Sequence, residues 1–422
     1  MSDTGDDAII DELRAWLEQN WDPDLTVAQW WERLGMAGWC APTWPVEWYG
    51  KGVSRDEANQ ISREIAAFGA AGPPSGLGLL LAGPTIVTHG TDEQKAHFLP
   101  DIVCGRQAWC QLFSEPGAGS DLAGLQAKAV RDGDEWVVNG QKVWTSGAQV
   151  ADLGMLLART DPDVAKHAGI SYFGVEMDQP GMDIRPLREM TGRALFNEVF
   201  MTDVRVADAD LIGGLNNGWR VANTTLANER AGLGAGGGGA AGSAIPGTKA
   251  GMLERRAGDF VTTARSGAGS ALSGRSSSML VDLAKGLGRV DDPNLRQDLM
   301  RLYTLNEIAR YTNLRAKAAK AAGRAPGPEA NTAKLSMSRI TRLSRDLGLA
   351  IVGAGGMLTG HDAPLDGMLA EMALFAPAVS IYGGSDEIQK NIIGERVLGL
   401  PSEPRPDKGV PFRELKVGTQ AG

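Results

Sequence analysis

The sequence predicts an α+β multidomain protein in which a helical domain, a β domain and a second helical domain follow one another. Three observations support this order. Apolar residues recur at helical spacing up to about residue 109, β-forming residues and tight-turn signals follow, and helical spacing returns at Gly218. A length of 422 residues corresponds to two or three domains of roughly 150 residues. We therefore place the domains at 1–110, 111–215 and 216–422.

The first domain is predicted to be helical. Ile10, Leu13 and Leu17 recur at the spacing of one helix face. Thr91 has the residue type of an N-cap, and Gln94 occupies the capping-box position three residues later. A helix is therefore expected to begin directly after Thr91.

The second domain is predicted to be a small β-barrel or sandwich. Two dipeptides within 127–159, Asp132-Gly133 and Asn139-Gly140, are strong tight-turn signals, so an antiparallel meander is expected there. Further strands are predicted at Ile170–Met177, Met182–Leu187 and Glu198–Val206.

The third domain is predicted to be a helical bundle that extends to about Leu400. One segment, 242–278, interrupts the helical pattern and is rich in glycine, serine, alanine and charge. We expect this insertion to be a mobile surface loop within the helical domain.

Composition excludes several classes of function. The net charge of −9 would repel a phosphate backbone, which argues against nucleic-acid binding. The first residues show no basic stretch leading into an apolar run, so a cytoplasmic protein without a membrane anchor is expected. Cys40, Cys104 and Cys110 form no CxxC pair, which indicates reduced thiols. The four histidines are scattered without HExxH spacing, so no metal site built by the protein is expected.

A glycine run at 232–239 contains the GxGxxG pattern twice. A dinucleotide fingerprint requires a preceding strand, whereas a helical pattern precedes this run. We therefore favour close approach of helices or of a ligand over a Rossmann site.

A stronger signal begins at Gln111, where a strand ends in a Gly/Ser turn, QLFSEPGAGSD. Such a turn can bind an anionic or heteroaromatic ligand, or it can be purely structural. Downstream are NGQKVWTSG at 139–147 and IYGGSDEIQKNIIGERVLGLP at 381–401, and GPTIVTHGTDEQKAHFLPDI lies upstream at 83–102. Together these motifs resemble the acyl-CoA dehydrogenase family over about residues 9–400.

The resemblance implies an N-terminal helical domain, a β domain and a C-terminal four-helix bundle. It also implies FAD as cofactor, an acyl-CoA substrate and an electron-transfer flavoprotein as electron acceptor, with oxygen as the alternative acceptor of an oxidase. Members usually form tetramers in which FAD lies near a subunit boundary, so a homotetramer or dimer is expected.

The resemblance also implies site residues in the β domain. Phe113, Ser114, Gly119 and Ser120 would line the flavin and the acyl-CoA entrance. In the strand motif, Trp144 would stack near the isoalloxazine and Ser146 would place a hydroxyl by its reactive edge. Without the flanking motif, Trp144 would be interpreted as a core aromatic.

Further cofactor contacts are expected in the C-terminal domain. The family's Arg-x-x-Phe-Gly segment, whose arginine meets FAD phosphate across the subunit boundary, is absent, and Arg289 is its candidate substitute. The alternative for Arg289 is a solvated loop residue. Gly353 resembles the glycine turn that approaches the cofactor, and Ser385 and Glu387 match polar positions close to FAD.

The catalytic base departs from the usual family pattern. Most members carry their glutamate directly after the tyrosine of the C-terminal motif, where this chain has Gly383. Isovaleryl-type and long-chain-type members carry it on a helix before an arginine, and Glu229-Arg230 matches that pattern. Glu229 is therefore the predicted base, Arg230 would organise the substrate site, and the Gly383 N–H would donate to the thioester oxygen. The alternative is a surface Glu–Arg pair with no catalytic role.

Two questions stay open at this stage. The missing Arg-x-x-Phe-Gly and the glycine at 383 also fit a non-catalytic partner subunit of a heteromeric enzyme. The glycines at 232–239 and at 383 remove side-chain volume near the expected acyl cavity, so a branched or bulky acyl group is the hypothesis.

Overall fold

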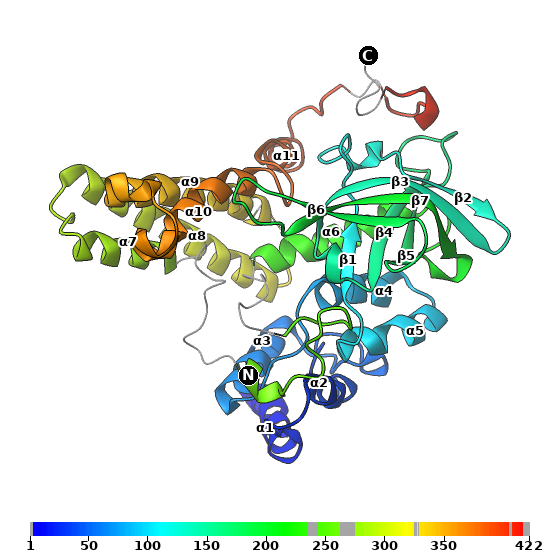
Figure 1. Ribbon diagram of the computed structural model, residues 1–422, viewed down its shortest axis with the longest axis horizontal. Coiled ribbons are helices and arrows are strands. Elements are labelled where there is room, and N and C mark those ends of the chain that lie inside the picture. The colour runs from blue at the N-terminus through cyan, green and yellow to red at the C-terminus, as the bar shows by residue number, and fades with distance from the viewer. Residues whose placement is uncertain are drawn as a thin grey trace.

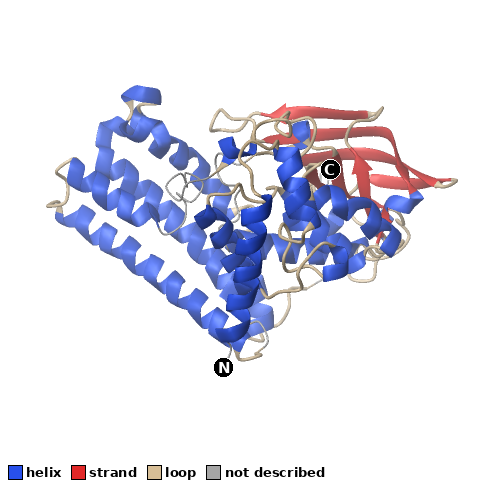
Figure 2. Ribbon diagram, turned by 90° about the horizontal axis from the view of Figure 1, so that it is seen from below, coloured by secondary structure: helices blue, strands red, loops and turns tan. Residues whose placement is uncertain are grey.

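The computed structural model describes residues 3–234, 244–261, 275–324, 327, 329–404 and 407–416. Figures 1 and 2 show a helical bundle at one end of the molecule and a sheet at the other, with the N-terminal helices packed below them. The predicted order of helical, β and helical parts is therefore confirmed.

The N-terminal domain packs five helices around a core rich in tryptophan. Its elements are α1 (Asp3–Asn20), α2 (Val27–Met36), α3 (Arg55–Phe68), the π-helical turn η2 (Gly78–Ala82), α4 (Gly83–His89) and α5 (Asp92–Val103). Leu13 and Leu17 are fully buried in this core. The predicted helix start is confirmed, since the Gln94 N–H donates to Thr91 Oγ1 at 3.3 Å and the Thr91 N–H donates to Gln94 Oε1 at 3.1 Å.

The β domain is one eight-stranded sheet. The strands are β1 (Trp109–Leu112), β2 (Lys128–Asp132), β3 (Glu135–Ser146), β4 (Leu153–Arg159), β5 (Ile170–Glu176), β6 (Met182–Leu187), β7 (Phe196–Ala207) and β8 (Leu211–Ile212). Their order is β6-β7-β3-β2-β4-β5-β8, and β1 pairs with β4 in parallel. The strands predicted at 170–177, 182–187 and 198–206 are confirmed as β5, β6 and β7.

One of the two predicted turns is wrong. Asp132-Gly133 does connect the antiparallel pair β2 and β3, but Asn139-Gly140 lies inside β3 at a register shift against β7. A Cβ at Gly140 would lie 2.5 Å from the Cβ of Ala127, so the glycine permits close approach of two chain segments instead of a turn. The simple meander is wrong as well, because β3 pairs with β7 and the short contact of β2 with β4 is parallel.

The C-terminal domain is a helical bundle. Its helices are α6 (Gly218–Gly234), α7 (Arg275–Gly286), α8 (Pro293–Ala321), α9 (Glu329–Val352), α10 (Met368–Phe375) and α11 (Asp386–Ile392). Leu280, Leu302 and Leu347 join α7, α8 and α9 in one buried cluster. Helix α6 lies between the bundle and the sheet (Figure 1), where it packs against η2, α4, β5 and α9. This central place makes α6 the element that connects all three parts.

The expected mobile insertion is wrong for residues 244–261. This segment packs on the N-terminal domain instead of looping from the bundle. The Val27 N–H donates to the Arg255 carbonyl at 2.8 Å and the Ala28 N–H donates to the Leu253 carbonyl at 2.9 Å, while Ala257 is fully buried. Backbone hydrogen bonding to the start of α2 fixes the segment, which composition did not reveal. Residues 242–243 and 262–274 lie outside the described residues.

Among the residues that the structure describes, no helix is both long enough and apolar enough to cross a membrane.

Candidate active site

The loop after β1 carries the Gly/Ser turn and is held by a buried ion pair. Lys142 on β3 is fully buried, and its Nζ donates to Glu115 Oε1 at 2.8 Å and to the Phe113 carbonyl at 3.0 Å. Glu115 also accepts the N–H groups of Gln126 at 2.7 Å and Ala127 at 2.9 Å. Burial lowers the pKa of the Lys142 ammonium, and the Glu115 carboxylate offsets part of that shift.

This bracing leaves the tip of the loop open. Phe113 is buried edge-to-face against Tyr172, with ring centroids 5.9 Å apart. The Ser114 carbonyl accepts the Val143 N–H at 2.9 Å, whereas Gly119 and Ser120 are exposed. A Cβ at Gly119 would meet no atom within 4 Å, so the tip has room for a ligand against its backbone.

Trp144 stands at the adjoining bulge of β3. Its φ of 62° is left-handed, a conformation that is rare for a bulky residue, and it lies at a register shift between Lys142 and Thr145. The indole is 58% exposed and contacts only the edge of Phe196 among aromatic rings described, at 5.7 Å. Ser146, two residues on, is exposed too. Trp144 is therefore not a core aromatic, and the strained backbone holds it outward.

Glu229 on α6 lies next to the end of β1, the strand that leads into the loop. It is half-buried, and Gln111 Nε2 on β1 donates to Glu229 Oε2 at 3.4 Å. Gln111 lies two residues before Phe113, so this contact joins the predicted base to the start of the loop. The side chain of Arg230 lies outside the described residues.

Buried hydroxyl groups fix the position of α6. Thr225 Oγ1 lies 2.9 Å from Thr85 Oγ1 on α4 and donates to Tyr172 Oη at 3.4 Å. His89 Nε2 on α4 lies 2.7 Å from Thr224 Oγ1. Burial, with a smaller contribution from the Arg220 charge, lowers the pKa of His89. The face of α6 next to Glu229 is thus tied to the N-terminal domain and to β5.

Gly383 lies in a tight corner before α11. Gly383 and Gly384 have left-handed φ values of 64° and 83°, and Gln389 Nε2 donates to their carbonyls at 3.3 and 3.4 Å. Ser385 is the N-cap of α11 and accepts the Ile388 N–H at 3.4 Å. Glu387 is exposed and forms an ion pair with Lys390 at 3.8 Å.

A buried carboxylate that the sequence reasoning missed fastens this corner to α9. Asp386 is 8% exposed, accepts Ser338 Oγ at 2.7 Å and forms an ion pair with Arg342. Lys334 Nζ donates to the Val379 carbonyl at 2.6 Å. Lys334 Nζ also lies 3.7 Å from Asp386 Oδ1. Lys334, Ser338 and Arg342 are spaced four residues apart on α9, so they share one helix face. That spacing was the signal that could have identified them.

The remaining predicted residues lie elsewhere in the chain. Arg289 is in the turn between α7 and α8, where Nη1 donates to the Ile351 carbonyl at 3.3 Å and Nη2 lies 3.5 Å from Asp292 Oδ2. Gly353 follows the end of α9 with a φ of 56°. Ile351 precedes Gly353 by two residues, so Arg289 and Gly353 are neighbours. Figure 1 shows these ends of α7, α8 and α9 away from the sheet, so one chain does not bring them to the loop after β1.

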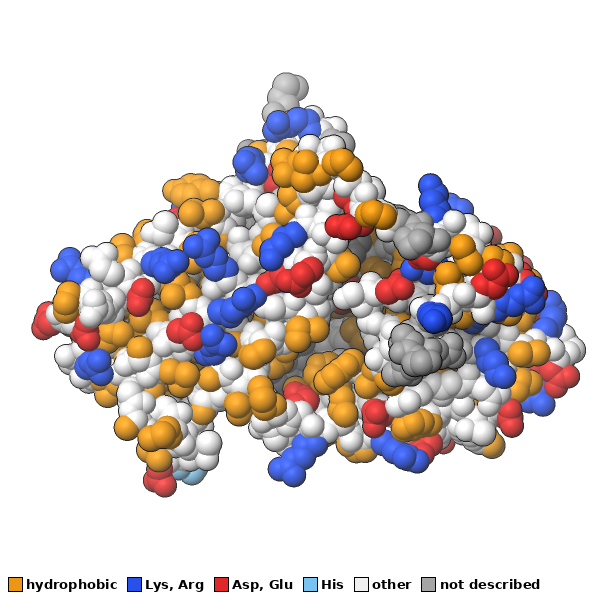
Figure 3. Space-filling model, turned by 90° about the horizontal axis from the view of Figure 1, so that it is seen from above, with side chains coloured by type: hydrophobic (Ala, Val, Ile, Leu, Met, Phe, Trp, Pro, Cys, Tyr) orange, Lys and Arg blue, Asp and Glu red, His pale blue; other side chains and the backbone are white. Residues whose placement is uncertain are grey.

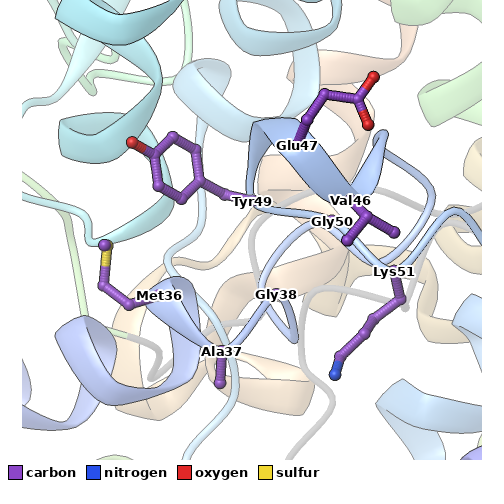
Figure 4. A pocket seen from close by; sticks show the side chains of 8 residues that line it. All are labelled: Met36, Ala37, Gly38, Val46, Glu47, Tyr49, Gly50 and Lys51. Carbon is purple, nitrogen blue, oxygen red and sulfur yellow. The ribbon is translucent and has the colours of Figure 1, made fainter.

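The surface is hollowed where the bundle meets the sheet domain, and hydrophobic side chains surround the hollow (Figure 3). A separate pocket of about 370 Å³ lies on the N-terminal domain (Figure 4). It is built from residues 36–51 and includes none of the predicted site residues. Its Lys51 ammonium is already engaged, 2.7 Å from Glu12 Oε1 and 4.0 Å from the centre of the Trp39 ring. The predicted site residues therefore lie outside this pocket.

Family models match three consecutive stretches of the chain. These are the acyl-CoA dehydrogenase N-terminal domain at 3–106, the middle domain at 110–204 and the C-terminal domain at 279–398. The matches follow the helical, β and helical order of the fold.

Individual proteins match over most of the chain. The acyl-CoA dehydrogenase IpdE1 of Mycobacterium tuberculosis is 39% identical over 89% of this chain and 88% of its own length. The acyl-CoA dehydrogenase FadE34 of the same organism is 39% identical over 87% of this chain, which spans 45% of that longer protein. A solved structure titled "Tcur3481-Tcur3483 steroid ACAD" has a TM-score of 0.71 and 28% identity, and covers 94% of this chain and 98% of its own.

Proposed function

Because the chain belongs to the acyl-CoA dehydrogenase family, an oxidoreductase family, we propose that it removes two hydrogens from the α and β carbons of an acyl-CoA thioester. The product is a trans-2-enoyl thioester. The observation that carries the proposal is Glu229 of α6 meeting Gln111 at the start of the loop that carries FSEPGAGSD. A carboxylate there is a suitable proton acceptor beside the loop expected to receive the substrate.

The loop after β1 and the bulge of β3 fit FAD. An aromatic ring held outward by a strained bulge, an exposed hydroxyl and a loop tip with open space next to a glycine are features that suit a large heteroaromatic ligand. Phe113, Ser114, Gly119, Trp144 and Ser146 would hold the flavin portion. Arg289, Gly353, Ser385 and Glu387 would contact it from the bundle, the first two from a neighbouring subunit. When bound, FAD supplies the acceptor for the β-hydrogen, which leaves as hydride.

The residues of this chain supply the acid–base chemistry. Glu229 takes the α-proton of the thioester, and Gln111 orients its carboxylate. Ser120 contacts the substrate at the loop tip. Arg230, the residue after Glu229 on α6, helps to organise the substrate site.

Gly383 supplies a backbone donor instead of a base. Its N–H is directed to the thioester oxygen, where negative charge develops as the α-proton leaves. The corner that holds it is rigid, because Asp386 is fastened to α9 and Gln389 binds the two glycine carbonyls. Glycine keeps the donor and leaves space for a substituent on the acyl chain.

We infer that the acyl group is bulky or branched, with a polycyclic group such as a steroid as the leading candidate. The absence of a side chain at Gly383 supports this inference, and so does the 28% identity to a structure whose title names a steroid ACAD. Turnover of short straight-chain thioesters alone would contradict it.

The proposed base is tested by mixing wild-type and Glu229→Gln holoprotein with acyl-CoA thioesters without oxygen. Glutamine keeps the shape but accepts no proton, so flavin bleaching should slow by about 10²–10⁴-fold. Glu307→Gln is the matched control, because Glu307 is also a half-buried glutamate on a bundle helix. Bleaching at the wild-type rate in Glu229→Gln would refute the assignment. Absorbance of bound flavin in each variant checks that cofactor loss is not the cause.

A second candidate function is a partner subunit of a heteromeric dehydrogenase. The missing Arg-x-x-Phe-Gly segment favours this function. The match with FadE34 covers 45% of that protein, so this relative contains a second part that the present chain does not match. A colourless purified chain that gains FAD only with a second subunit would support the partner. A yellow chain active alone would support the complete enzyme. Comparing reduction of an electron-transfer flavoprotein with hydrogen peroxide yield then decides between a dehydrogenase and an oxidase.

A further inference from the structure

The last described segment of the chain, 407–416, lies against the β domain. Figure 1 shows the chain leaving the bundle after α11, and it shows this segment beside the sheet. The Phe412 N–H donates to the Val164 carbonyl at 2.8 Å, and the Arg413 N–H donates to the Pro162 carbonyl at 3.0 Å. Arg413 Nη1 lies 2.9 Å from Asp163 Oδ1. This segment, called the strap below, is thus fixed along 162–165 by both backbone and side chains.

Two basic residues connect the strap to the loop that follows the Gly/Ser turn. Lys166 Nζ lies 2.8 Å from Asp407 Oδ2 on the strap and 3.0 Å from both carboxylate oxygens of Asp121. Lys166 is 16% exposed and Asp407 32%, whereas Asp121 is 59% exposed, so the Lys166–Asp407 side of this bridge is the more shielded from water. It joins the strap directly to the residue after Ser120.

The second connection passes through Arg159 at the end of β4. Its guanidinium donates to the Ala123 carbonyl at 2.6 Å, to the Leu125 carbonyl at 3.3 Å and to the Lys166 carbonyl. The Phe412 ring covers the guanidinium with its centre 3.6 Å away. Arg159 is 4% exposed, and a desolvated cation is stabilised by an aromatic face.

We propose that the strap holds residues 119–125 in the conformation that receives the acyl-CoA thioester, with Arg159 and Lys166 as positioning residues through which it acts. The role of the loop rests on the proposed function. The Glu115–Lys142 pair fixes the start and the inner side of this loop, and the strap fixes its outer side. Without Phe412, water reaches the Arg159 guanidinium and competes with the two loop carbonyls. Without the Asp407 carboxylate, Lys166 loses one of its two acidic partners.

The test uses the full-length holoprotein with Phe412→Leu, Asp407→Asn and the double variant. Leucine keeps apolar packing but lacks the aromatic face, and Asp407→Asn changes only charge, so folding should be retained. Phe200→Leu and Asp183→Asn are matched controls. Arg185 lies over the Phe200 ring at 4.6 Å and pairs with Asp183 at 2.6 Å, and neither contact includes a residue of 119–125.

Hydrogen exchange of the loop is the first readout. The Gly124 N–H donates to the Asp121 carbonyl at 2.9 Å and the Leu125 N–H donates to the Leu122 carbonyl at 3.1 Å, so both amides report loop order. These amides should exchange about tenfold faster in the Phe412→Leu/Asp407→Asn double variant than in wild type. In the Phe200→Leu and Asp183→Asn controls they should exchange at the wild-type rate. The second readout is steady-state kinetics, where KM for the acyl-CoA should rise about fivefold or more while kcat changes less than about twofold.

The two readouts separate the inference from the proposed function. Unchanged exchange at Gly124 and Leu125 in the double variant overturns the strap inference, whatever the enzyme does with acyl-CoA. Faster exchange with an unchanged KM overturns its role in substrate binding. The third outcome is faster exchange in the double variant while the wild-type protein turns over no acyl-CoA. This outcome refutes the proposed function, and the strap remains the element that orders the loop.

Discussion

The buried Lys142–Glu115 pair allows a sharp test of how the site loop is built. Lys142→Met removes a fully buried ammonium that donates to a carboxylate at 2.8 Å and to a carbonyl at 3.0 Å. Glu115, 8% exposed, then keeps its two backbone donors and the charge of Arg159, which lies farther away, but loses the ammonium that is hydrogen-bonded to it. Leaving a buried charge without its partner costs about 3–5 kcal/mol.

We therefore expect Lys142→Met to lower the free energy of unfolding by about 3–5 kcal/mol. Adding Glu115→Gln removes the stranded charge, so the double variant should be less destabilised than the sum of the two single variants, with a coupling of about 1–3 kcal/mol. Urea unfolding followed by tryptophan fluorescence measures both quantities, because Trp136 and Trp144 flank Lys142 on β3.

Arg205→Met is the control for this cycle. Arg205 on β7 pairs with Asp132 at 2.6 Å, but both side chains are about half exposed, at 49% and 61%. An exposed pair contributes about 0–1 kcal/mol. A loss below about 1 kcal/mol in Lys142→Met, or strictly additive single variants, would refute the assignment of Lys142 as the brace of the loop.

Three further predictions follow from individual contacts. Gln111→Leu removes the donor to the proposed base, so kcat should fall about tenfold or more in a variant that binds FAD as wild type does; an unchanged kcat would count against a positioning role for Gln111. Burial lowers the pKa of His89, so the unfolded chain binds the proton more readily and stability should fall as the pH drops below about 6.5. Melting curves at pH 7.5 and 5.5 should show a smaller acid loss in His89→Gln but not in the control His361→Gln, which alters a fully exposed histidine. Gly140→Ala would place a Cβ 2.5 Å from that of Ala127 and should lower the free energy of unfolding by about 1–3 kcal/mol, and a melting temperature equal to wild type would contradict the clash.

Much of the fold could be predicted because its signals are local. The capping box at Thr91 and the hairpin at Gly133 depend on residues within one turn of each other, and both are confirmed. The Asn139-Gly140 prediction was wrong although it used the same logic. The same Asn-Gly pair can form a tight turn or can allow a second chain segment to pass close to the glycine. Only the close approach of Ala127 to Gly140 in the folded structure distinguishes the two cases.

The candidate site was predicted residue by residue but not as an arrangement. Motifs indicated Phe113, Trp144, Glu229 and Gly383, yet no sequence pattern indicated Gln111 as the neighbour of Glu229. The structure brings the loop, the β3 bulge and α6 together, and it leaves Arg289 at the other end of the bundle. That separation fits the expectation that Arg289 serves the cofactor of another subunit.

The order of the three domains, the helix and strand boundaries marked by caps and turns, and the family could all be predicted from the amino-acid sequence. Each depends on periodicity or on motifs that are contiguous in the chain. The tertiary structure alone decided that 244–261 pairs with the start of α2, that Asp386 joins α9, and that Phe412 covers Arg159. These contacts join residues tens to hundreds of positions apart. Their strength depends on the exclusion of water from paired polar groups, which exists only once the chain has folded.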